Sequence, residues 1–410
     1  MKDVIKCRAC SSSSIKLVLE LGEQSLSGVF RSDDIENILS GPLSLISCDN
    51  CKLIQLSKSY PLDDMYNDGY GYKSGLTLYM QQHLQSIIKL ACSIIQLASN
   101  DTILDIGSND GTLLNGYNDS SLNLIGIDPV SSKYLDLYPK NSKVVSDFFS
   151  SENYFSVTKI KSRIVTSVSM FYDLEDPVKF AQEVSSVLDG EGIWIFEQSY
   201  LPAMLRYNSY DTICHEHIEY YSLEAIQNIL DKANMIIIQA SQNEVNGGSI
   251  RLTATHKNNN LSTLISPELT WLRLQEINHD IFSLSTFINF KNNIIRHKND
   301  LITLLTLLNK MGKKVIGYGA STKGNVILQY CGIGPELIPF IGDITPSKNG
   351  TFTPGTMIPI ISMEKAKAMN PDYFLVLPWA FRNDILSREK SLLLSGTKFI
   401  FPLPYVEIIN

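Results

Sequence analysis

The chain has 410 residues, a net charge of −7 and 44% hydrophobic residues, which predicts two or three domains with more than one buried core. An acidic chain lacks the surplus of Lys and Arg that phosphate contacts need, so nucleic-acid binding is not expected. No apolar run approaches the roughly 18 residues of a membrane span, and the first residues lack the apolar core of a secretory signal. We therefore expect a cytoplasmic protein, whose seven cysteines favour metal binding or free thiols over disulfides.

Two C-x-x-C pairs near the N-terminus predict a metal site. The first pair is Cys7 and Cys10, and the second is Cys48 and Cys51. Each pair can form a knuckle turn, and together they supply the four thiolates that a tetrahedral zinc ion takes at about 2.3 Å. Four protein ligands leave no open position, so we expect structural Zn²⁺ without a catalytic role. Four reduced thiols or a redox pair are the alternatives.

The rest of the chain alternates between helical patterns and short apolar runs. Helices are predicted at 76–98 and 177–188, strands at 103–106, 124–127, 164–168, 193–196 and 373–377, and one or two long connecting helices within 258–310. Alternation of this kind favours parallel sheets. The sequence therefore predicts an α/β protein with three domains: a zinc-binding module (1–66), a central Rossmann-like domain (67–257), and a helical connector with a second Rossmann-like lobe (258–410).

The segment ILDIGSNDGTLL (103–114) predicts a ligand-binding turn after the first of these strands. Gly107 allows a tight turn close to a ligand, and Gly111 lets the next helix pack close to the sheet. G-x-G-x-x-G and P-loop spacings are missing, which disfavours a pyrophosphate ligand here. Asp128 ends the second strand, where a carboxylate can bind both hydroxyls of a ribose. Asp147 and Phe148 offer an acid and a ring for adenine; an ordinary turn with surface acids is the alternative.

The segment YDTICHEHIEYY (210–221) concentrates His, Glu and Tyr. His215 and His217 flank Glu216 in this run. A histidine with a pKa of about 6.5 can accept a proton at neutral pH, and an adjacent carboxylate can orient it, which favours acid–base chemistry. A metal site and a hydrogen-bonded pair without a catalytic role are the alternatives.

A second strand-then-glycine segment, VIGYGASTKGN (315–325), predicts an anion site. Gly319 bares backbone N–H groups, Ser321 offers a hydroxyl, and Lys323 adds a positive charge at a helix N-terminus. These features suit a nucleotide diphosphate, with Asp343 and Lys348 as an edge for the nucleoside. A Rossmann turn without a ligand is the alternative.

The segment NGGSIR (246–251) predicts a further loop of this kind. Its small residues permit close approach of a ligand, and Arg251 can face a phosphate. A solvated hairpin turn with a surface arginine is the alternative.

Together these motifs resemble the nucleotide-sugar C-methyltransferases, class I S-adenosylmethionine-dependent enzymes that add a branch methyl to a 4-keto deoxysugar. DIGSNDGTLL and GIDP resemble the S-adenosylmethionine motifs, and the four-cysteine module, the CHEH run and the second lobe extend the resemblance over essentially the whole chain. The resemblance implies that the central domain binds S-adenosylmethionine and that the C-terminal lobe holds a nucleotide-diphosphate sugar, in a monomer or homodimer.

The resemblance also implies roles for individual residues. His217 is the expected base and Glu216 assists it, while Tyr72, which we favour over Tyr70, and His215 complete the expected catalytic set. The expected cofactor residues are Asp105, Gly107, Asn109, Gly111, Asp128, Pro129, Asp147, Phe148 and Ser169. The expected substrate residues are Asn246, Gly248, Arg251, Gly319, Ser321, Lys323, Asn325, Asp343 and Lys348.

Two positions depart from the family pattern. Cys214 stands where the family's run begins with Tyr, and 169–173 contains no His. Both missing groups can hydrogen-bond an oxyanion, so Tyr172, Tyr220 and Tyr221 are candidates to replace them.

Three other functions fit parts of the sequence. The first is an O- or N-methyltransferase on the same scaffold, and the second is a zinc-containing binding protein that has lost catalysis. The third is an NAD-dependent oxidoreductase that uses the turn at Gly317, which the lack of G-x-G-x-x-G disfavours.

Overall fold

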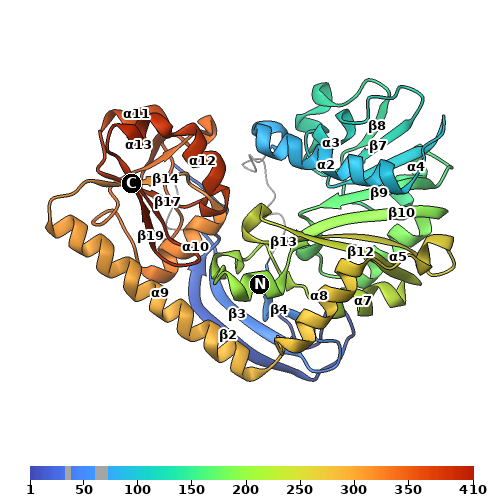
Figure 1. Ribbon diagram of the computed structural model, residues 1–410, viewed down its shortest axis with the longest axis horizontal. Helices are drawn as coiled ribbons and strands as arrows, with labels where there is room; N and C mark the ends of the chain where they lie inside the picture. The colour runs from blue at the N-terminus through green and yellow to red at the C-terminus, as the bar shows by residue number, and fades with distance from the viewer. Residues whose placement is uncertain (33–37, 61–72) are drawn as a thin grey trace.

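The computed structural model describes residues 1–32, 38–60 and 73–410. These residues form three larger sheets and one two-stranded sheet in an α/β architecture. Figure 1 shows two α/β lobes side by side, with the N-terminal sheet, in blue, below them. The predicted α/β class is thus confirmed. The predicted domain boundaries stay a prediction, and the first of them, at 66–67, lies outside the described residues.

The N-terminal sheet has four antiparallel strands and takes one of them from the central part of the chain. Its order is β11 (Glu219–Tyr220), β4 (Ile54–Leu56), β3 (Ser40–Cys48) and β2 (Ile15–Ser25), and a separate pair joins β1 (Lys2–Asp3) to β5 (Lys58–Ser59). Because β11 belongs to the histidine-rich segment, that segment is anchored to the N-terminal module by backbone pairing.

The central sheet has seven strands. Its order is β12 (Met235–Asn243), β13 (Ser249–His256), β10 (Leu188–Ser199), β9 (Ser162–Val168), β6 (Thr102–Ile106), β7 (Asn123–Ile127) and β8 (Ser142–Val145). Strands β10, β9, β6, β7 and β8 run parallel, and β13 is antiparallel to both of its neighbours. The four strands predicted in this region all lie in this sheet.

Both faces of the central sheet are buried, which explains why its strands read as continuous apolar runs. Successive residues point to opposite faces: Ile103 packs with α2 (Leu78–Ile94) and α3 (Thr112–Asn115), whereas Leu104 packs on the other face. That second face is covered by α4 (Ser151–Val157), α5 (Pro177–Val187), α6 (Leu201–Arg206) and α7 (Leu223–Lys232).

The C-terminal lobe is a second Rossmann-like unit. Its six-stranded sheet has the order β16 (Ile360–Ser362), β15 (Ile341–Asp343), β14 (Val315–Tyr318), β17 (Tyr373–Val376), β18 (Lys398–Phe401) and β19 (Glu407–Ile409), and only β19 is antiparallel within it. Its helices are α10 (Thr322–Cys331), α11 (Met363–Ala368), α12 (Arg382–Arg388) and α13 (Lys390–Leu394).

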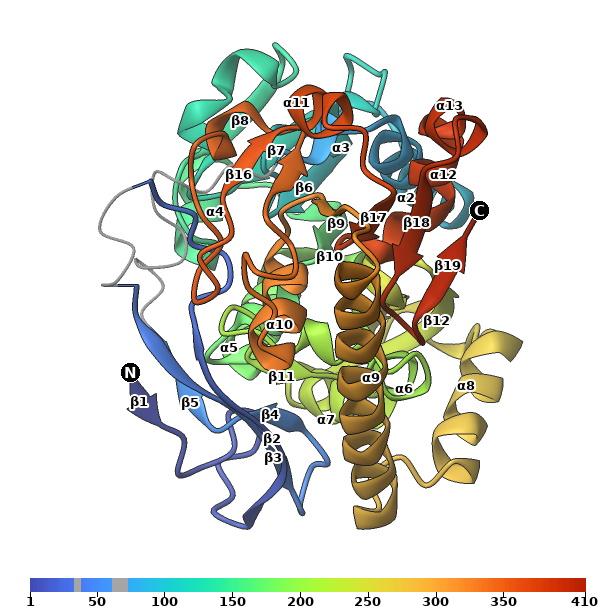
Figure 2. The same ribbon diagram turned by 90° about the vertical axis from the view of Figure 1, so that its left-hand side faces the viewer.

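Two helices connect the lobes, α8 (Pro267–Asn278) and α9 (Leu284–Lys310). Figure 2 shows the long helix α9 upright in the lower half of the view, with the shorter helix α10 beside it. Short 3₁₀ turns complete the fold: η2 (Ser74–Leu76), η3 (Ser131–Lys133), η4 (Leu135–Leu137), η5 (Phe171–Asp173), η6 (Tyr210–Thr212), η7 (Val245–Gly247), η8 (Asn260–Thr263), η9 (Pro346–Lys348) and η10 (Trp379–Phe381).

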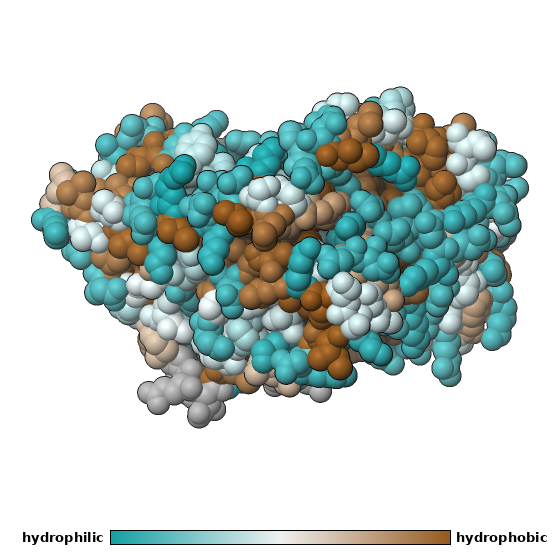
Figure 3. Space-filling view, turned by 90° about the horizontal axis from the view of Figure 1, so that it is seen from below, coloured by the Kyte–Doolittle hydropathy of each residue, from teal (hydrophilic) through white to brown (hydrophobic). Residues whose placement is uncertain are grey.

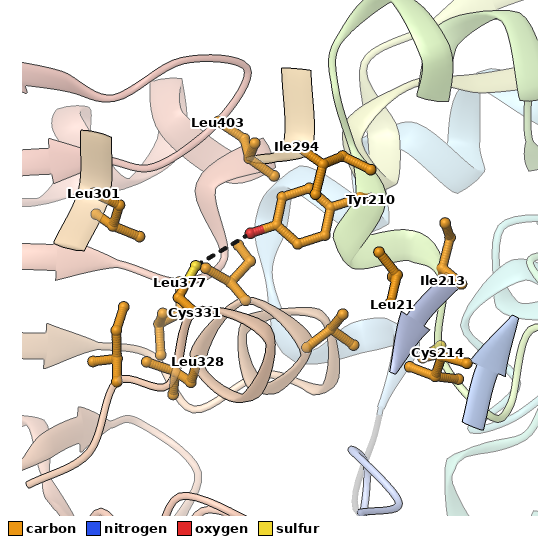
Figure 4. Close-up of a cluster of buried hydrophobic side chains, with 14 of the residues drawn as sticks. Leu21, Tyr210, Ile213, Cys214, Ile294, Leu301, Leu328, Cys331, Leu377 and Leu403 are labelled. Carbon is orange, nitrogen blue, oxygen red and sulfur yellow. Dashed lines mark hydrogen bonds between the residues drawn. The ribbon is translucent and has the colours of Figure 1, made fainter. Parts of the chain in front are cut away.

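One hydrophobic core is shared by all three parts of the chain. Leu21 of the N-terminal sheet, Tyr210 of the histidine-rich segment, Ile294 of α9 and Leu328 of α10 belong to the same buried cluster. Figure 4 shows these side chains converging, with the Tyr210 hydroxyl 3.5 Å from the sulfur of Cys331. The lobes and the module are therefore packed against one another rather than merely linked.

No helix among the described residues is both long and apolar enough to cross a membrane. Figure 3 shows a face that is largely hydrophilic, with hydrophobic side chains gathered towards its middle. Exposed apolar residues of α8 and α9 include Trp271, Leu274, Ile277 and Ile288. The expected monomer or homodimer stays a prediction.

A buried carboxylate fixes α8 to the central lobe. Glu276, 5% exposed, accepts the backbone N–H of Leu223 at 2.6 Å and that of Glu224 at 3.3 Å, so it satisfies two donors of the first turn of α7. The Tyr200 hydroxyl donates to the same carboxylate at 2.7 Å. The negative charge also complements the helix dipole at this N-terminus.

We expect Glu276→Ala to lower the free energy of unfolding by about 1–3 kcal/mol, because it leaves buried donors without an acceptor. Chemical denaturation of the full-length protein measures this loss. Glu268→Ala, on the exposed first turn of the same helix, is the control and should cost less than about 1 kcal/mol. Equal stabilities of the two variants would contradict the anchoring role of Glu276.

Candidate active site

The four N-terminal cysteines lie together, with all ligand atoms within 4.8 Å of one another. The sulfur–sulfur distance is 3.5 Å between Cys7 and Cys51 and also between Cys10 and Cys48. A tetrahedral Zn²⁺ with bonds of about 2.3 Å places its ligands about 3.8 Å apart, so the cluster has the size and chemistry that zinc requires.

The two knuckles share one backbone geometry. The N–H of Ser11 donates to the carbonyl of Cys7 at 2.8 Å, and the N–H of Lys52 donates to the carbonyl of Cys48 at 3.1 Å. Ser11 and Lys52 both have positive φ, 59° and 64°. This repeated turn brings the two cysteines of each pair to the same side, as the C-x-x-C spacing predicts.

A cavity of about 280 Å³ opens at the carboxyl ends of β6, β7 and β9. Seven of the expected cofactor residues line it: Asp105, Gly107, Asn109, Asp128, Pro129, Phe148 and Ser169. Ligands bind at this edge of open α/β sheets, and the cavity has both apolar walls and carboxylates. Its chemistry therefore fits a nucleoside-bearing sulfonium ligand.

The glycine turn shapes this cavity as the sequence predicts. Gly107 has φ of 71°, and a Cβ there would lie 3.3 Å from the side chain of Met170. The N–H of Asn109 donates to Asp128 at 3.0 Å, and the N–H of Val130 donates to its other carboxylate oxygen at 2.7 Å. These bonds hold the Asp128 carboxylate at the strand end.

Burial changes the protonation of one carboxyl in the cavity. Asp105 is 3% exposed, and burial raises its pKa to about 7, although the Thr166 hydroxyl donates to it at 2.6 Å. A carboxyl in this state can donate as well as accept a hydrogen bond near neutral pH.

Two expected cofactor residues lie outside the lining. Gly111 begins α3 with φ of 73°, and a Cβ there would lie 2.9 Å from the Tyr138 ring, so it serves helix packing. Asp147 accepts the N–H of Phe148 at 2.7 Å and is not part of the wall.

The sequence analysis missed some lining residues, including Ser74, Phe149, Met170, Asp173 and Glu175. The N–H of Ser74 donates to Asn109 at 2.9 Å, a contact between residues too far apart in sequence to foresee. Only Phe149 could have been predicted to line the cavity, because it directly follows Phe148, which we expected there.

His217 is held in one tautomer. Its Nδ1 lies 3.0 Å from the carbonyl oxygen of Thr212, so Nδ1 carries the proton and Nε2 is a lone-pair acceptor. Its ring centroid lies 4.2 Å from that of Tyr172, whose neighbours Met170 and Asp173 line the cavity. Burial first, and then the nearby positive charge of Lys323, lower the pKa of His217 to about 3. The imidazole is therefore neutral at physiological pH.

Glu216 and His215 point to different surroundings. Burial raises the pKa of Glu216, and its Oε2 is buried without a hydrogen-bond partner among the described residues. His215 is fully buried against the Tyr60 ring at 4.6 Å, and its Nε2 lies 3.2 Å from the Gly41 carbonyl. The structure thus places His215 in the packing of the N-terminal sheet, away from the surroundings of His217.

The tyrosines named at the sequence level differ in position. The Tyr172 ring packs against the His217 ring at a tilt of 53°, and the Tyr220 hydroxyl donates to the backbone carbonyl of His217 at 2.7 Å. Tyr221 donates to the buried carboxylate of Glu219. Tyr70 and Tyr72 lie outside the described residues.

The second glycine turn holds several of the expected substrate residues together. Gly319 has φ of 79°, and Ser321 caps α10 by accepting the N–H of Gly324 at 3.0 Å. Asp343 accepts the N–H of Ala320 at 2.7 Å, and the Lys348 amine donates to the carbonyl of Ala320 at 2.6 Å. Asp343 therefore sits at the end of β15 much as Asp128 sits at the end of β7.

Three other expected substrate residues have structural partners. Arg251 lies in β13 opposite Glu197 of β10 and donates to it at 2.8 Å, so its charge is neutralised within the sheet. Asn325 is fully buried and donates to the carbonyl of Ser27 at 2.7 Å. Gly248 has φ of 122°, and a Cβ there would lie 2.6 Å from Ala203.

The sequence analysis also missed a buried triad beside the cavity. Glu197 accepts hydrogen bonds from both His83 of α2 and Arg251 of β13. Glu197 is 1% exposed, and this burial by itself would raise the pKa of its carboxyl. His83 and Arg251 outweigh that effect and hold the pKa below the ordinary value. Nothing in the sequence linked His83 to this pair.

Three family models match consecutive parts of the chain. They are described as "Putative zinc binding domain" for residues 7–66, "Methyltransferase domain" for residues 78–240 and "C-methyltransferase C-terminal domain" for residues 244–404. A curated relative, C-methyltransferase NovU of Streptomyces niveus, is 28% identical over 423 residues, which covers 100% of this chain and 99% of the relative.

Solved structures of other enzymes resemble part of the chain. N-methyltransferase NodS of Bradyrhizobium japonicum with S-adenosyl-l-homocysteine is 12% identical, with 47% of this chain and 93% of that chain covered and a TM-score of 0.34. The cyclopropane synthase MmaA2 of Mycobacterium tuberculosis is 11% identical, with 47% and 90% covered and a TM-score of 0.34.

Cys48→Ser should abolish stoichiometric zinc, because three thiolates and a hydroxyl form a much weaker site. Elemental analysis of the purified protein measures the metal. Cys92→Ser is the control, since this exposed thiol lies outside the cluster and its loss should leave the metal content unchanged. Full zinc occupancy in Cys48→Ser would contradict a four-cysteine site.

Proposed function

Because three family models and a C-methyltransferase relative match the chain, we propose that it is an S-adenosylmethionine-dependent C-methyltransferase and that its acceptor is a nucleotide-linked 4-keto deoxysugar. We further propose that His217 removes the proton from the carbon beside the ketone and that this carbon then takes the methyl group. The four cysteines hold a structural zinc ion in this proposal.

The observation that carries the proposal is the hydrogen bond between His217 Nδ1 and the carbonyl oxygen of Thr212. This bond leaves Nε2 unprotonated in the neutral imidazole, so the lone pair of Nε2 is free to accept a proton. The His217 ring lies against the ring of Tyr172. Met170 and Asp173, on either side of Tyr172 in the chain, line the cofactor cavity.

The reaction balances with these groups. His217 Nε2 takes the α-proton, and the electron pair of the broken C–H bond forms an enolate. When bound, S-adenosylmethionine supplies an electrophilic methyl group, and the enolate carbon forms a bond to it while the carbon–sulfur bond breaks. The protein contributes mainly by holding the reacting atoms about 3 Å apart and in line.

We propose two donors to the enolate oxygen: Glu216, which precedes His217 in the chain, and Tyr172, which contacts the His217 ring. Glu216 has a pKa raised by burial and an unpartnered Oε2 among the described residues, so its neutral form can donate to an acceptor there. The Tyr172 ring contacts the His217 ring, with centroids 4.2 Å apart. Donors to a developing negative charge often make the largest single contribution to catalysis.

The C-terminal lobe supports the choice of a nucleotide-linked acceptor. Its glycine turn, the capping Ser321 and the strand-end Asp343 form the type of edge that binds nucleotides in Rossmann-like sheets. Lys348 adds a positive charge that lies 4.5 Å from the Phe30 ring. An acceptor held at this edge presents its sugar between the two lobes.

Mass spectrometry with S-adenosylmethionine and a panel of 4-keto nucleotide sugars tests the acceptor class. We expect a gain of about 14 daltons on the sugar with one of them, and incorporation of solvent deuterium beside the ketone when the methyl donor is left out. Methylation of a hydroxyl or amine without deuterium exchange would instead indicate an O- or N-methyltransferase.

His217→Ala should reduce turnover by at least about 10²-fold, the lower range for loss of a general base, and leave the affinity for S-adenosylmethionine within about threefold. Steady-state kinetics and calorimetric titration measure the two quantities. His279→Ala, at the exposed end of α8, is the control and should keep wild-type turnover. Wild-type turnover in His217→Ala would reject His217 as the base.

A further inference from the structure

Lys323 extends from the C-terminal lobe to the central lobe. It is the second residue of α10, yet its amine lies 3.0 Å from the Thr212 hydroxyl and 2.6 Å from the carbonyl oxygen of Asn246. At the sequence level we assigned this amine to a diphosphate. In the structure, two of its three donors are directed at turns of the central lobe.

The first of these turns carries the group that orients the base. Thr212 ends η6, and its carbonyl oxygen accepts the Nδ1 proton of His217. The neighbouring Asp211, fully buried, accepts the indole N–H of Trp379 at 2.7 Å. Lys323 and Trp379 therefore fix this turn from two points of the C-terminal lobe.

The second turn leads to the cofactor cavity. Asn246 has φ of 55°, and its side-chain amide donates to the Ser169 hydroxyl at 3.2 Å. Ser169 lines the cavity. A Cβ on Gly247 would lie 3.0 Å from the Trp379 ring, so the same tryptophan also packs over this turn. One lysine thus connects the turn of the base with the loop at the cavity.

We propose that Lys323 is a positioning residue for the methyl transfer: it holds the Thr212 turn and the Asn246 turn at a fixed separation and places its positive charge beside His217. This role rests on the proposed function, because it presupposes His217 as the base. Docking of the C-terminal lobe then completes the catalytic geometry of the central lobe.

The charge of Lys323 acts on the base as well as on the geometry. Burial lowers the pKa of His217 most, and Lys323 lowers it further, so removal of the charge should raise that pKa. Other ionisable groups of the elements packed there are Asp211, Cys214 and Glu216 of the same segment, Tyr172 and Asp173 of η5, and Tyr220 of β11. Burial lowers the pKa of Lys323, and the nearby carboxylate of Asp211 partly offsets this shift.

The test compares Lys323→Met, Lys323→Arg and Thr212→Val. For Lys323→Met we expect kcat to fall about 10²-fold, the effect of a misplacement of about 1 Å, with the affinity for S-adenosylmethionine unchanged within threefold. NMR of protein labelled with ¹⁵N-histidine should show a higher pKa for His217 and a weaker preference for the Nδ1–H tautomer. Lys323→Arg should keep the pKa low, and Thr212→Val, which removes one contact, should give a smaller loss of kcat.

Lys298→Met is the matched control, because this lysine also donates to a backbone carbonyl, that of Tyr330, and stays within the connector and C-terminal lobe. It should keep wild-type kcat and the wild-type pKa of His217. In Lys323→Met, an unchanged kcat with an unchanged pKa of His217 would overturn the positioning role, and so would a rise in the KM for the nucleotide sugar alone. Wild-type turnover in His217→Ala would instead reject the proposed function, so the two failures are distinguishable.

Discussion

The arrangement of the molecule depends on the burial of one segment, 210–221, between three structural parts. Its backbone pairs with the N-terminal sheet through β11, and Tyr210 enters the core that α9 and α10 share. Between these anchors, Thr212 and His217 are joined by a single hydrogen bond. The segment contains few regular hydrogen bonds of its own, so its conformation is imposed by packing from all sides.

This burial explains the protonation states at the site. A charged imidazole loses its hydration inside the protein, and the adjacent amine makes the charged form still less favourable. The same desolvation favours the protonated form of Glu216. The neutral imidazole of His217 and the raised pKa of Glu216 are thus both consequences of where the segment lies.

The sequence predicted the periodic parts of the fold well. The parallel strands are apolar on both faces, and Gly107 and Gly319 mark turns with positive φ, so local pattern and tertiary structure agree. The two metal-binding turns could be predicted because paired C-x-x-C spacings in one chain are typical of zinc sites. The sequence could not reveal that Arg251 faces Glu197, because the register of two strands decides this contact. The sequence likewise could not show that Lys323 and Asn325 contact other parts of the chain, because a helix N-terminus has the same pattern whether an anion or a protein segment lies in front of it.

The two-residue strand β11 has a consequence for how this architecture can be divided. It completes the N-terminal sheet, while the helix that follows it, α7, packs on the central sheet. An N-terminal fragment that ended after the cysteine-rich region would lack β11, the outer strand of its sheet. The isolated fragment would then expose the apolar side chains of β4 that this strand covers. Transfer of the module by recombination therefore requires transfer of the segment with the two histidines as well, which ties the four-cysteine cluster and the histidine-rich segment into one heritable unit.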